Sequence, residues 1–143
     1  MKVLVDINVV IDVLERHPAF FDDSYAVLRL VAEDEIDGFV AAGSIADIYY
    51  ILRKSGMTSD QVRTTLIRLT QVIDLCDTTA ADVNEALALN MPDVEDAVLA
   101  ACAKRMRADA IVTRDLHDFA ASPIPALSPA QLLDHLKESA ATP

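Results

Sequence analysis

Short apolar runs alternate with helical patterns along the whole chain, and this alternation constrains the fold more than any other feature. Four runs have the β-branched, apolar character of buried strands, at 2–6, 39–42, 71–76 and 108–113. Capping residues and apolar stripes predict helices that begin near residues 8, 22, 44, 58, 79, 93 and 128. Strands separated by helices usually pair in parallel, so the sequence predicts an α/β domain with a short, mostly parallel central sheet.

Several helix starts have specific capping signals. Thr58 and Gln61 have the spacing of a capping box, in which each side chain bonds to the backbone of the other. Ser128 followed by Pro129 is the pattern of a cap with proline at the first helical position. These signals place two of the predicted helices with little ambiguity at their N-termini.

The composition is that of a folded and strongly acidic domain. The 143 residues are 52% hydrophobic, with 12 basic residues against 23 acidic ones and a formal net charge of −11. This balance argues against a protein that holds nucleic acid through a broad basic surface, but it does not exclude a nucleic-acid enzyme. An acidic protein that acts on phosphates needs cations in its site, because bound metal ions reverse the local charge. No repeat or linker divides the chain, so we expect one domain over residues 1–138 and a disordered tail at 139–143.

Cysteine content and the N-terminus indicate the compartment. We expect Cys76 and Cys102 to be reduced and buried rather than joined in a disulfide. Asp6 and Asp12 interrupt the N-terminal apolar stretch too early for an export signal, and no stretch has the length of a membrane span. We therefore expect a cytoplasmic protein that does not enter a membrane.

Carboxylates occur where the predicted strands end. Asp6 ends the first strand, and Asp115 comes two residues after Thr113 at the end of the last one. Asp47 lies in the first turn of the helix after the second strand, and Asp96 is in the helix that leads into the fourth. Because ligands of open parallel sheets bind at the carboxyl ends of the strands, we expect these four acids at one rim.

Each acid also has a purely structural explanation. Asp47 comes three residues after Ser44, which is the spacing of a capping box. Asp93 is suited to be a helix N-cap, and Asp115 to begin a turn. The capping explanation does not apply to Asp6, because Asp6 ends a strand and a strand end needs no cap. Capping also does not explain why acids from four segments should face one point. Convergence of the acids therefore favours a common site.

Carboxylates that converge need protons or cations. At about 4 Å, each like-charged pair costs about 4 kcal/mol at an effective dielectric constant of about 20. An all-oxygen cluster without Cys or His ligands favours a hard divalent ion, Mg²⁺ or Mn²⁺. Such an ion polarises a phosphoryl oxygen and lowers the pKa of a bound water molecule. The cluster therefore predicts metal-dependent hydrolysis at phosphorus.

Three segments of the chain resemble the PIN-domain ribonucleases, which include the VapC-type toxins of bacterial toxin–antitoxin pairs. They are VLVDINVVIDVL, SIADIYYILRK and PDVEDAVLAACAKRMRADAIVTRDLHDF, and their order and spacing agree over about residues 2 to 119. The resemblance implies a PIN-like three-layer α/β/α fold. It also implies a metal-dependent endoribonuclease that uses four acids and Mg²⁺ or Mn²⁺.

Matched residue by residue, Asp6 takes the place of the first family acid, Asp96 that of the third and Asp115 that of the fourth. The second acid is usually Glu in this family, and here it is Asp47, which is one methylene shorter. Ile7 stands where the family often has Thr. The shorter acid predicts either a weaker second metal contact or one made through a bridging water molecule, and Ile7 removes a hydroxyl group. Neither departure abolishes the site, and both argue against strong activity.

Further residues match supporting positions of the family. Asn8 and Thr113 correspond to small polar residues that orient acids or water. Asp93 and Asp118 are nearby acids that would support the site through water. Arg114 is the candidate for contact with substrate phosphate, with an ordinary surface arginine as the alternative.

Two functional interpretations from different classes stay open. The first is hydrolysis of RNA phosphodiester bonds, as in the toxin of a toxin–antitoxin pair. The second is a catalytically weakened PIN-like module that docks RNA or protein, and it is motivated by Asp47 and Ile7. A phospho-acceptor domain lacks convincing support, and a phosphatase with an Asp-x-Asp pair is excluded because position 8 is Asn8.

The resemblance also implies partners. A VapC-type protein acts on an RNA substrate, pairs as a homodimer through its helices, and is silenced by a small antitoxin whose tail enters the acidic cleft. A basic tail would complement the charge of such a cleft.

Overall fold

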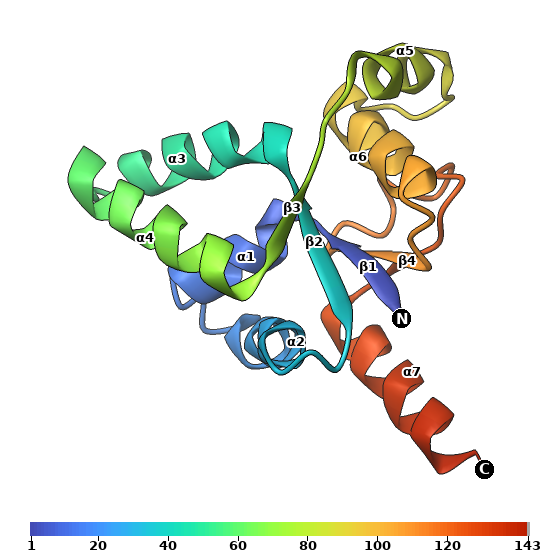
Figure 1. Ribbon diagram of the computed structural model, residues 1–143, viewed down its shortest axis with the longest axis horizontal. Coiled ribbons are helices and arrows are strands. Elements are labelled where there is room, and N and C mark those ends of the chain that lie inside the picture. Colours follow the sequence, from blue (N-terminus) through green and yellow to red (C-terminus); the bar gives the residue numbers. More distant parts are fainter. Residues whose placement is uncertain (143) are drawn as a thin grey trace.

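A five-stranded, all-parallel sheet lies at the centre of the computed structural model, which describes residues 1–142 (Figure 1). The strands are β1 (Lys2–Val5), β2 (Asp37–Ala41), β3 (Asp74–Cys76), β4 (Ala110–Val112) and β5 (Ala126–Leu127). Their order in the sheet is β3-β2-β1-β4-β5, so β1 is central. The predicted α/β class and parallel central sheet are confirmed.

Helices connect the strands. They are α1 (Ile7–Leu14), α2 (Phe21–Ala32), α3 (Ile45–Lys54), α4 (Ser59–Val72), α5 (Ala80–Ala88), α6 (Val94–Arg105) and α7 (Pro129–Ala141), with a short 3-10 turn, η1, at Ala42–Ser44. The capping box of α4 is present: Thr58 Oγ1 accepts from Gln61 N at 3.2 Å, and Gln61 Oε1 accepts from Thr58 N at 2.8 Å. Ser128 caps α7 as predicted, with Pro129 as its first residue.

The helices cover both faces of the sheet, as the alternating side chains of β1 show. Val3 and Val5 belong to a core shared with α1, α2, α3, α4 and α7, whereas Leu4 belongs to a core shared with α5 and α6. All three side chains are at most 1% exposed. Figure 1 shows α5 and α6 on the opposite side of the sheet from α1 and α2. This is the expected three-layer α/β/α arrangement.

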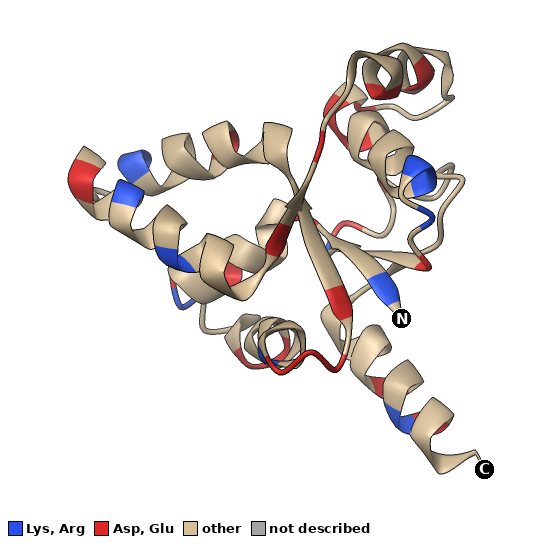
Figure 2. Ribbon diagram, viewed as in Figure 1, with Lys and Arg blue, Asp and Glu red and all other residues tan. Residues whose placement is uncertain are grey.

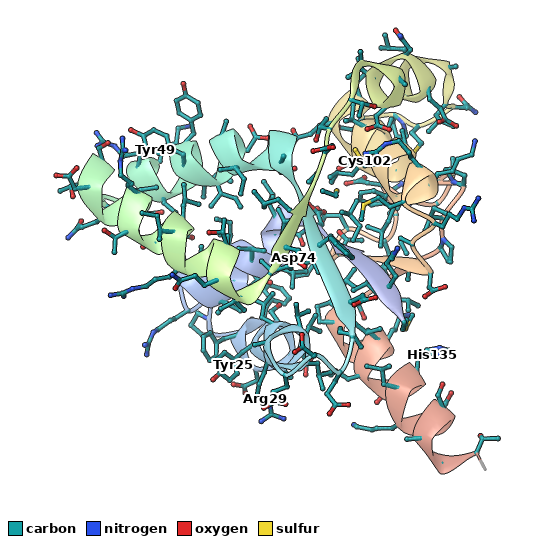
Figure 3. All side chains as sticks on the ribbon, in the orientation of Figure 1. Tyr25, Arg29, Tyr49, Asp74, Cys102 and His135 are labelled. Atoms are coloured by element: carbon teal, nitrogen blue, oxygen red, sulfur yellow. The ribbon has the colours of Figure 1, made fainter. Side chains whose placement is uncertain are left out.

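The alanine-rich helix α6 packs directly on the sheet. Its small residues Ala97, Ala100, Ala101 and Ala103 are almost completely buried, which lets the helix backbone approach the strands closely. Cys102 lies in the same layer, among the side chains between α6 and the sheet (Figure 3). As expected, Cys76 and Cys102 are free and buried.

Three features differ from the sequence-based expectation. The segment expected as a strand at 71–76 is helical at its start, because α4 continues to Val72 and β3 begins at Asp74. The two-residue strand β5 was not predicted, since it is too short to show a pattern. Residues 139–141 form the end of α7 in place of a disordered tail, and Pro143 lies outside the described residues.

Charge and hydropathy agree with the sequence analysis. Lys and Arg residues are spread over several helices, without one dominant basic face in the view of Figure 2. Across residues 1–142, no helix combines the length and apolar character needed to cross a membrane.

Candidate functional site

The carboxyl ends of β1 and β4 bring two buried polar residues together. Asp6 follows β1 and Thr113 follows β4, and the parallel register pairs Val5 with Val112 directly before them. The backbone N–H of Asp6 donates to the Val112 carbonyl at 2.9 Å. Asp6 is 6% exposed and Thr113 is fully buried. The sheet register therefore places the Asp6 carboxylate and the Thr113 hydroxyl next to each other.

The side chain of Asn8 links the two strand ends to the following loop. Its Nδ2 group donates to Asp6 Oδ2 at 3.1 Å, to Thr113 Oγ1 at 3.2 Å and to Asp115 Oδ2 at 3.1 Å. The Thr113 hydroxyl donates to Asp6 Oδ2 at 2.8 Å and accepts from the Asp115 N–H at 3.0 Å. Four of the residues selected from the sequence, Asp6, Asn8, Thr113 and Asp115, thus form one hydrogen-bonded group.

The N-terminus of α6 brings further acids to this group. Asp93 is the N-cap of α6, and its Oδ1 accepts from the Asp96 N–H at 3.0 Å, so its structural interpretation is correct. The pKa of Asp96 is raised to about 7, mainly by burial and to a smaller extent by the charges of Asp93, Asp6 and Asp118. Repulsion of this kind requires the carboxylates to be close, so α6 and β1 contribute acids to the same region.

Asp47 lies half-buried in the first turn of α3. Its interpretation as part of a capping box is wrong, because the Ser44 side chain makes no capping hydrogen bond. Burial, followed by the charges of Asp47, Asp93 and Asp6, raises the pKa of Glu95. Glu95 is therefore a further acid of the site that the sequence analysis missed. Its signal was the run PDVED, in which Glu95 directly precedes Asp96.

Arg114 has contacts that the sequence did not indicate. Its Nε donates to Asp12 Oδ2 at 2.8 Å, and its guanidinium carbon lies 4.1 Å from the centre of the Phe20 ring. Its side chain is 29% exposed. Arg114, the candidate for phosphate contact, is therefore already in an ion pair with Asp12 of α1, and it lies next to the group formed by Asp6, Asn8, Thr113 and Asp115.

The acids at the rim carry charge that basic side chains do not offset. Burial raises the pKa of the Asp6 carboxyl, a hydrogen bond from Thr113 opposes this, and the charge of Asp115 adds to it, with a net rise. Within residues 1–142, five basic side chains form ion pairs, and all five pair with acids outside this group, namely Asp12, Glu33, Asp82, Glu85 and Asp134. The region therefore favours cations.

The donor set fits a hard divalent ion, because it consists of carboxylates with amide and hydroxyl groups beside them. Among residues 1–142, no three His, Cys, Asp or Glu side chains already surround a single point in the geometry of a metal site. Binding an ion would thus require the carboxylates to move towards one another. Burial is the largest cause of the raised pKa values of Asp6 and Asp96, and the charges of neighbouring acids add to it. A cation would relieve that repulsion.

Known structures of toxin–antitoxin proteins are similar to this chain. VapBC2 from Rickettsia felis, bound to a DNA fragment from its promoter, superposes with a TM-score of 0.71 and 19% identity, covering 90% of this chain and 98% of that chain. A toxin–antitoxin complex from Klebsiella pneumoniae gives 0.68 and 17%, covering 90% and 98%. VapBC-1 from nontypeable Haemophilus influenzae gives 0.67 and 12%, covering 91% and 99%. At these identities the likeness shows the fold.

The sequence itself matches a family model. No curated protein matches the chain. The model of the PIN domain matches residues 2–117, which is most of the chain and includes every acid of the rim up to Asp115. The protein therefore belongs to the PIN domain family.

Proposed function

We propose that this protein is a Mg²⁺- or Mn²⁺-dependent endoribonuclease that hydrolyses RNA phosphodiester bonds in the cytoplasm, as the toxin of a toxin–antitoxin pair. One observation carries the proposal. Acids from several segments gather at the carboxyl edge of the sheet, and burial raises the pKa values of Asp6 and Asp96 there. The charge of Asp115 adds to the rise for Asp6, and the charges of neighbouring acids, Asp6 among them, add to the rise for Asp96. Membership of the PIN domain family supports a nuclease.

The proposed metal ligands are Asp6, Asp96 and Asp115, with Asp47 assisting. A bound ion would supply a polarised phosphoryl oxygen and a more acidic water molecule. The chain itself orients the carboxylates. Thr113 holds Asp6 through a hydrogen bond of 2.8 Å, and the Asn8 amide spans Asp6 and Asp115. Such preorganisation reduces the cost of bringing the carboxylates around a cation.

Other acids have secondary roles in this proposal. Glu95 lies beside Asp47, as the effect of Asp47 on the Glu95 pKa requires, and we expect it to share the task of the second acid. Asp93 caps α6 and raises the pKa of Asp96. Asp93 and Asp118 would support the bound ion through water. Only the Nε of Arg114 bonds to Asp12. The other N–H groups of its guanidinium could donate hydrogen bonds to a substrate phosphate.

The test is cleavage of RNA by the purified protein with Mn²⁺, Mg²⁺ or EDTA. We expect cleavage with either metal and none with EDTA, and we expect Asp96→Asn to abolish it with the fold intact. Asp74→Asn is the matched control, because Asp74 is an exposed acid at the start of β3 (Figure 3). Metal-dependent cleavage retained in Asp96→Asn would refute the assigned site.

A binding module without turnover is the second candidate. It is favoured by the short Asp47 side chain and by Ile7 in place of a hydroxyl-bearing residue. In that case the protein would bind RNA or a protein partner without cleaving any RNA, even at saturating Mn²⁺. Robust turnover on any RNA would remove this alternative.

We also propose a small antitoxin with a basic tail as partner, and a homodimer. The solved relatives are toxin–antitoxin complexes, and the acidic rim would complement a basic tail. Large apolar side chains are exposed on α3 and α4, where Tyr50 is 67% and Ile67 is 55% exposed. Light scattering of the wild type and of Tyr50→Lys tests whether this surface forms the dimer. A monomeric wild type would contradict it.

A further inference from the structure

A buried carboxylate lies one helical turn beyond Asn8. Asp12 is in α1 and is 1% exposed. Its Oδ2 accepts from Ser24 Oγ at 3.1 Å and from Arg114 Nε at 2.8 Å, whereas Oδ1 has no hydrogen-bond partner among residues 1–142. A buried charge is costly unless it is paired. The fold therefore depends on Arg114 to compensate Asp12.

Two contacts of different kinds hold the Arg114 side chain. The ion pair with Asp12 fixes Nε, and the Phe20 ring lies against the guanidinium group at 4.1 Å. Phe20 directly precedes α2, so the side chain of Arg114 is held by both α1 and the start of α2. A side chain fixed at both its Nε and its planar face also fixes the backbone that carries it.

That backbone belongs to the acid group. The N–H of Arg114 donates to Asn8 Oδ1 at 3.3 Å. Only the oxygen of the Asn8 amide can accept, so this bond determines which way the amide faces. Its NH₂ group then points at Asp6, Thr113 and Asp115.

We propose that Asp12 and Arg114 form a positioning pair for the acid site. The pair holds the segment 113–115 against α1, so that the Asn8 amide keeps its orientation between Asp6 and Asp115. Neither Asp12 nor the Arg114 side chain needs to touch a metal ion or RNA for this role. The consequence for metal binding rests on the proposed function, whereas the consequence for the Asn8 amide does not.

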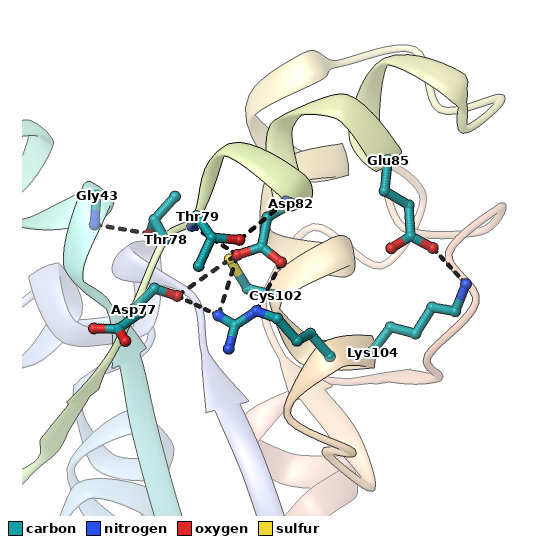
Figure 4. Close-up of polar contacts among 9 residues, drawn as sticks. Gly43, Asp77, Thr78, Thr79, Asp82, Glu85, Cys102 and Lys104 are labelled. Carbon is teal, nitrogen blue, oxygen red and sulfur yellow. Dashed lines mark hydrogen bonds and ion pairs between the residues drawn. The ribbon is translucent and has the colours of Figure 1, made fainter.

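The chain contains a matched control pair. Asp82 is also 1% exposed, and its Oδ1 accepts from Arg105 Nε at 2.9 Å, joining α5 to α6 (Figure 4). Thr79, Cys102 and the Asp77 carbonyl belong to the same network, and within residues 1–142 none of its hydrogen bonds involves the Asn8 group. Both pairs join a buried Asp to an Arg, so loss of either one should lower the stability of the fold. Only the pair of Asp12 and Arg114 is hydrogen-bonded to the Asn8 group.

The first experiment measures hydrogen exchange of the Asn8 side-chain amide by NMR. The variants are Arg114→Met, the apolar double variant Asp12→Leu with Arg114→Met, and Arg105→Met as control. Apolar replacement of a whole buried pair is often tolerated, which guards against loss of folding. We expect exchange to be about tenfold faster in both Arg114 variants, as for loss of one hydrogen bond, and unchanged in Arg105→Met. Unchanged exchange in the Arg114 variants would overturn the proposal.

The second experiment titrates Mn²⁺ and follows the thermal unfolding temperature of the same variants. We expect the apparent Mn²⁺ dissociation constant to rise about tenfold in Arg114→Met and in the double variant. An additional variant, Arg114→Lys, retains a cation for Asp12, and we expect it to recover part of the lost Mn²⁺ affinity. Arg105→Met should lower the unfolding temperature but leave the Mn²⁺ dissociation constant unchanged. Wild-type affinity in Arg114→Met would overturn the positioning role. If Mn²⁺ does not change the unfolding temperature of the wild type, the proposed metal site is refuted. The exchange rate of the Asn8 amide would still test whether Asp12 and Arg114 orient that amide.

Discussion

The Thr113 hydroxyl donates a 2.8 Å hydrogen bond to Asp6 Oδ2, across a sequence separation of 107 residues. Both side chains are buried, so the carboxylate has little water to replace this donor. The bond opposes the rise that burial causes in the pKa of Asp6. It therefore stabilises the charged form of the carboxylate on which the proposed metal site depends.

Replacement of Thr113 by Val removes this donor at nearly constant volume. We expect a loss of about 1–3 kcal/mol in the free energy of unfolding near neutral pH, because a buried carboxylate is left with fewer donors. Urea denaturation measures the loss. Thr113→Ser retains the hydroxyl and serves as control. Equal stability of Thr113→Val and the wild type would show that the bond contributes nothing.

The pH dependence of stability follows from Asp96. Its pKa in the folded protein is about 7, above the ordinary value of 3.8. The unfolded chain therefore loses this proton at lower pH than the native protein does. The stability that Asp96 contributes is fully present below about pH 4 and is lost as the pH rises through about 7.

The variant Asp96→Asn cannot ionise and so escapes this loss. At about pH 8 and without metal, we expect it to be more stable than the wild type by about 1 kcal/mol, a value reduced for solvent screening because Asp96 is only half-buried. The difference should disappear near about pH 4. Urea denaturation at both pH values is the measurement, with Asp74→Asn as control for the loss of one negative charge. A wild type more stable than Asp96→Asn at the higher pH contradicts the prediction.

The length of the second acid is tested by Asp47→Glu. Asp47 lies half-buried and makes no capping bond with Ser44, so its side chain is available to the site. If one missing methylene weakens the metal contact, the longer side chain should lower the apparent Mn²⁺ dissociation constant by about tenfold, the effect of one improved charged contact. Thermal shift titration provides this constant. Weaker Mn²⁺ binding by Asp47→Glu would show that the site is built around the shorter acid.

The close approach of α2 to β2 is tested by Gly38→Ala. A Cβ atom at Gly38 would lie 2.4 Å from Val31 Cγ2, a distance that real contacts do not allow. We expect a loss of about 1–3 kcal/mol in the free energy of unfolding from this overpacking. Val31→Ala removes the obstructing methyl groups, so the double variant should be more stable than the sum of the two single effects predicts. Additive effects in urea denaturation would indicate that no clash exists.

Much of the rim could be predicted because a parallel sheet imposes a simple rule. Strand ends are visible in the sequence, and all parallel strands end at one edge, so Asp6 and Thr113 were predictable as neighbours. Asp93 was predictable as a cap because N-caps depend on local sequence alone. The same local rule was wrong for Asp47, where the 3-10 turn before α3 leaves Ser44 without a capping bond.

The remaining features depend on contacts between distant segments. The ion pair of Asp12 with Arg114 joins residues 102 apart, and neither residue has a neighbour in sequence that indicates the other. Strand β5 has two residues, and its pairing with β4 depends on where the preceding loop is held. Glu95 belongs to the site because α6 packs against the sheet, not because of a spacing rule.

The sequence by itself determined the α/β class, the order of the helices and of the four longer strands, and the acids expected at the carboxyl edge of the sheet apart from Glu95, because apolar periodicity and capping are local properties. Only the tertiary structure decided how Asn8 is oriented towards those acids and which contacts fix it. The orientation of Asn8 and the pairing of Asp12 with Arg114 depend on packing α1 against the segment after β4. Burial then determines the energetic importance of these contacts, because a charge or donor removed from water must find its partner within the fold.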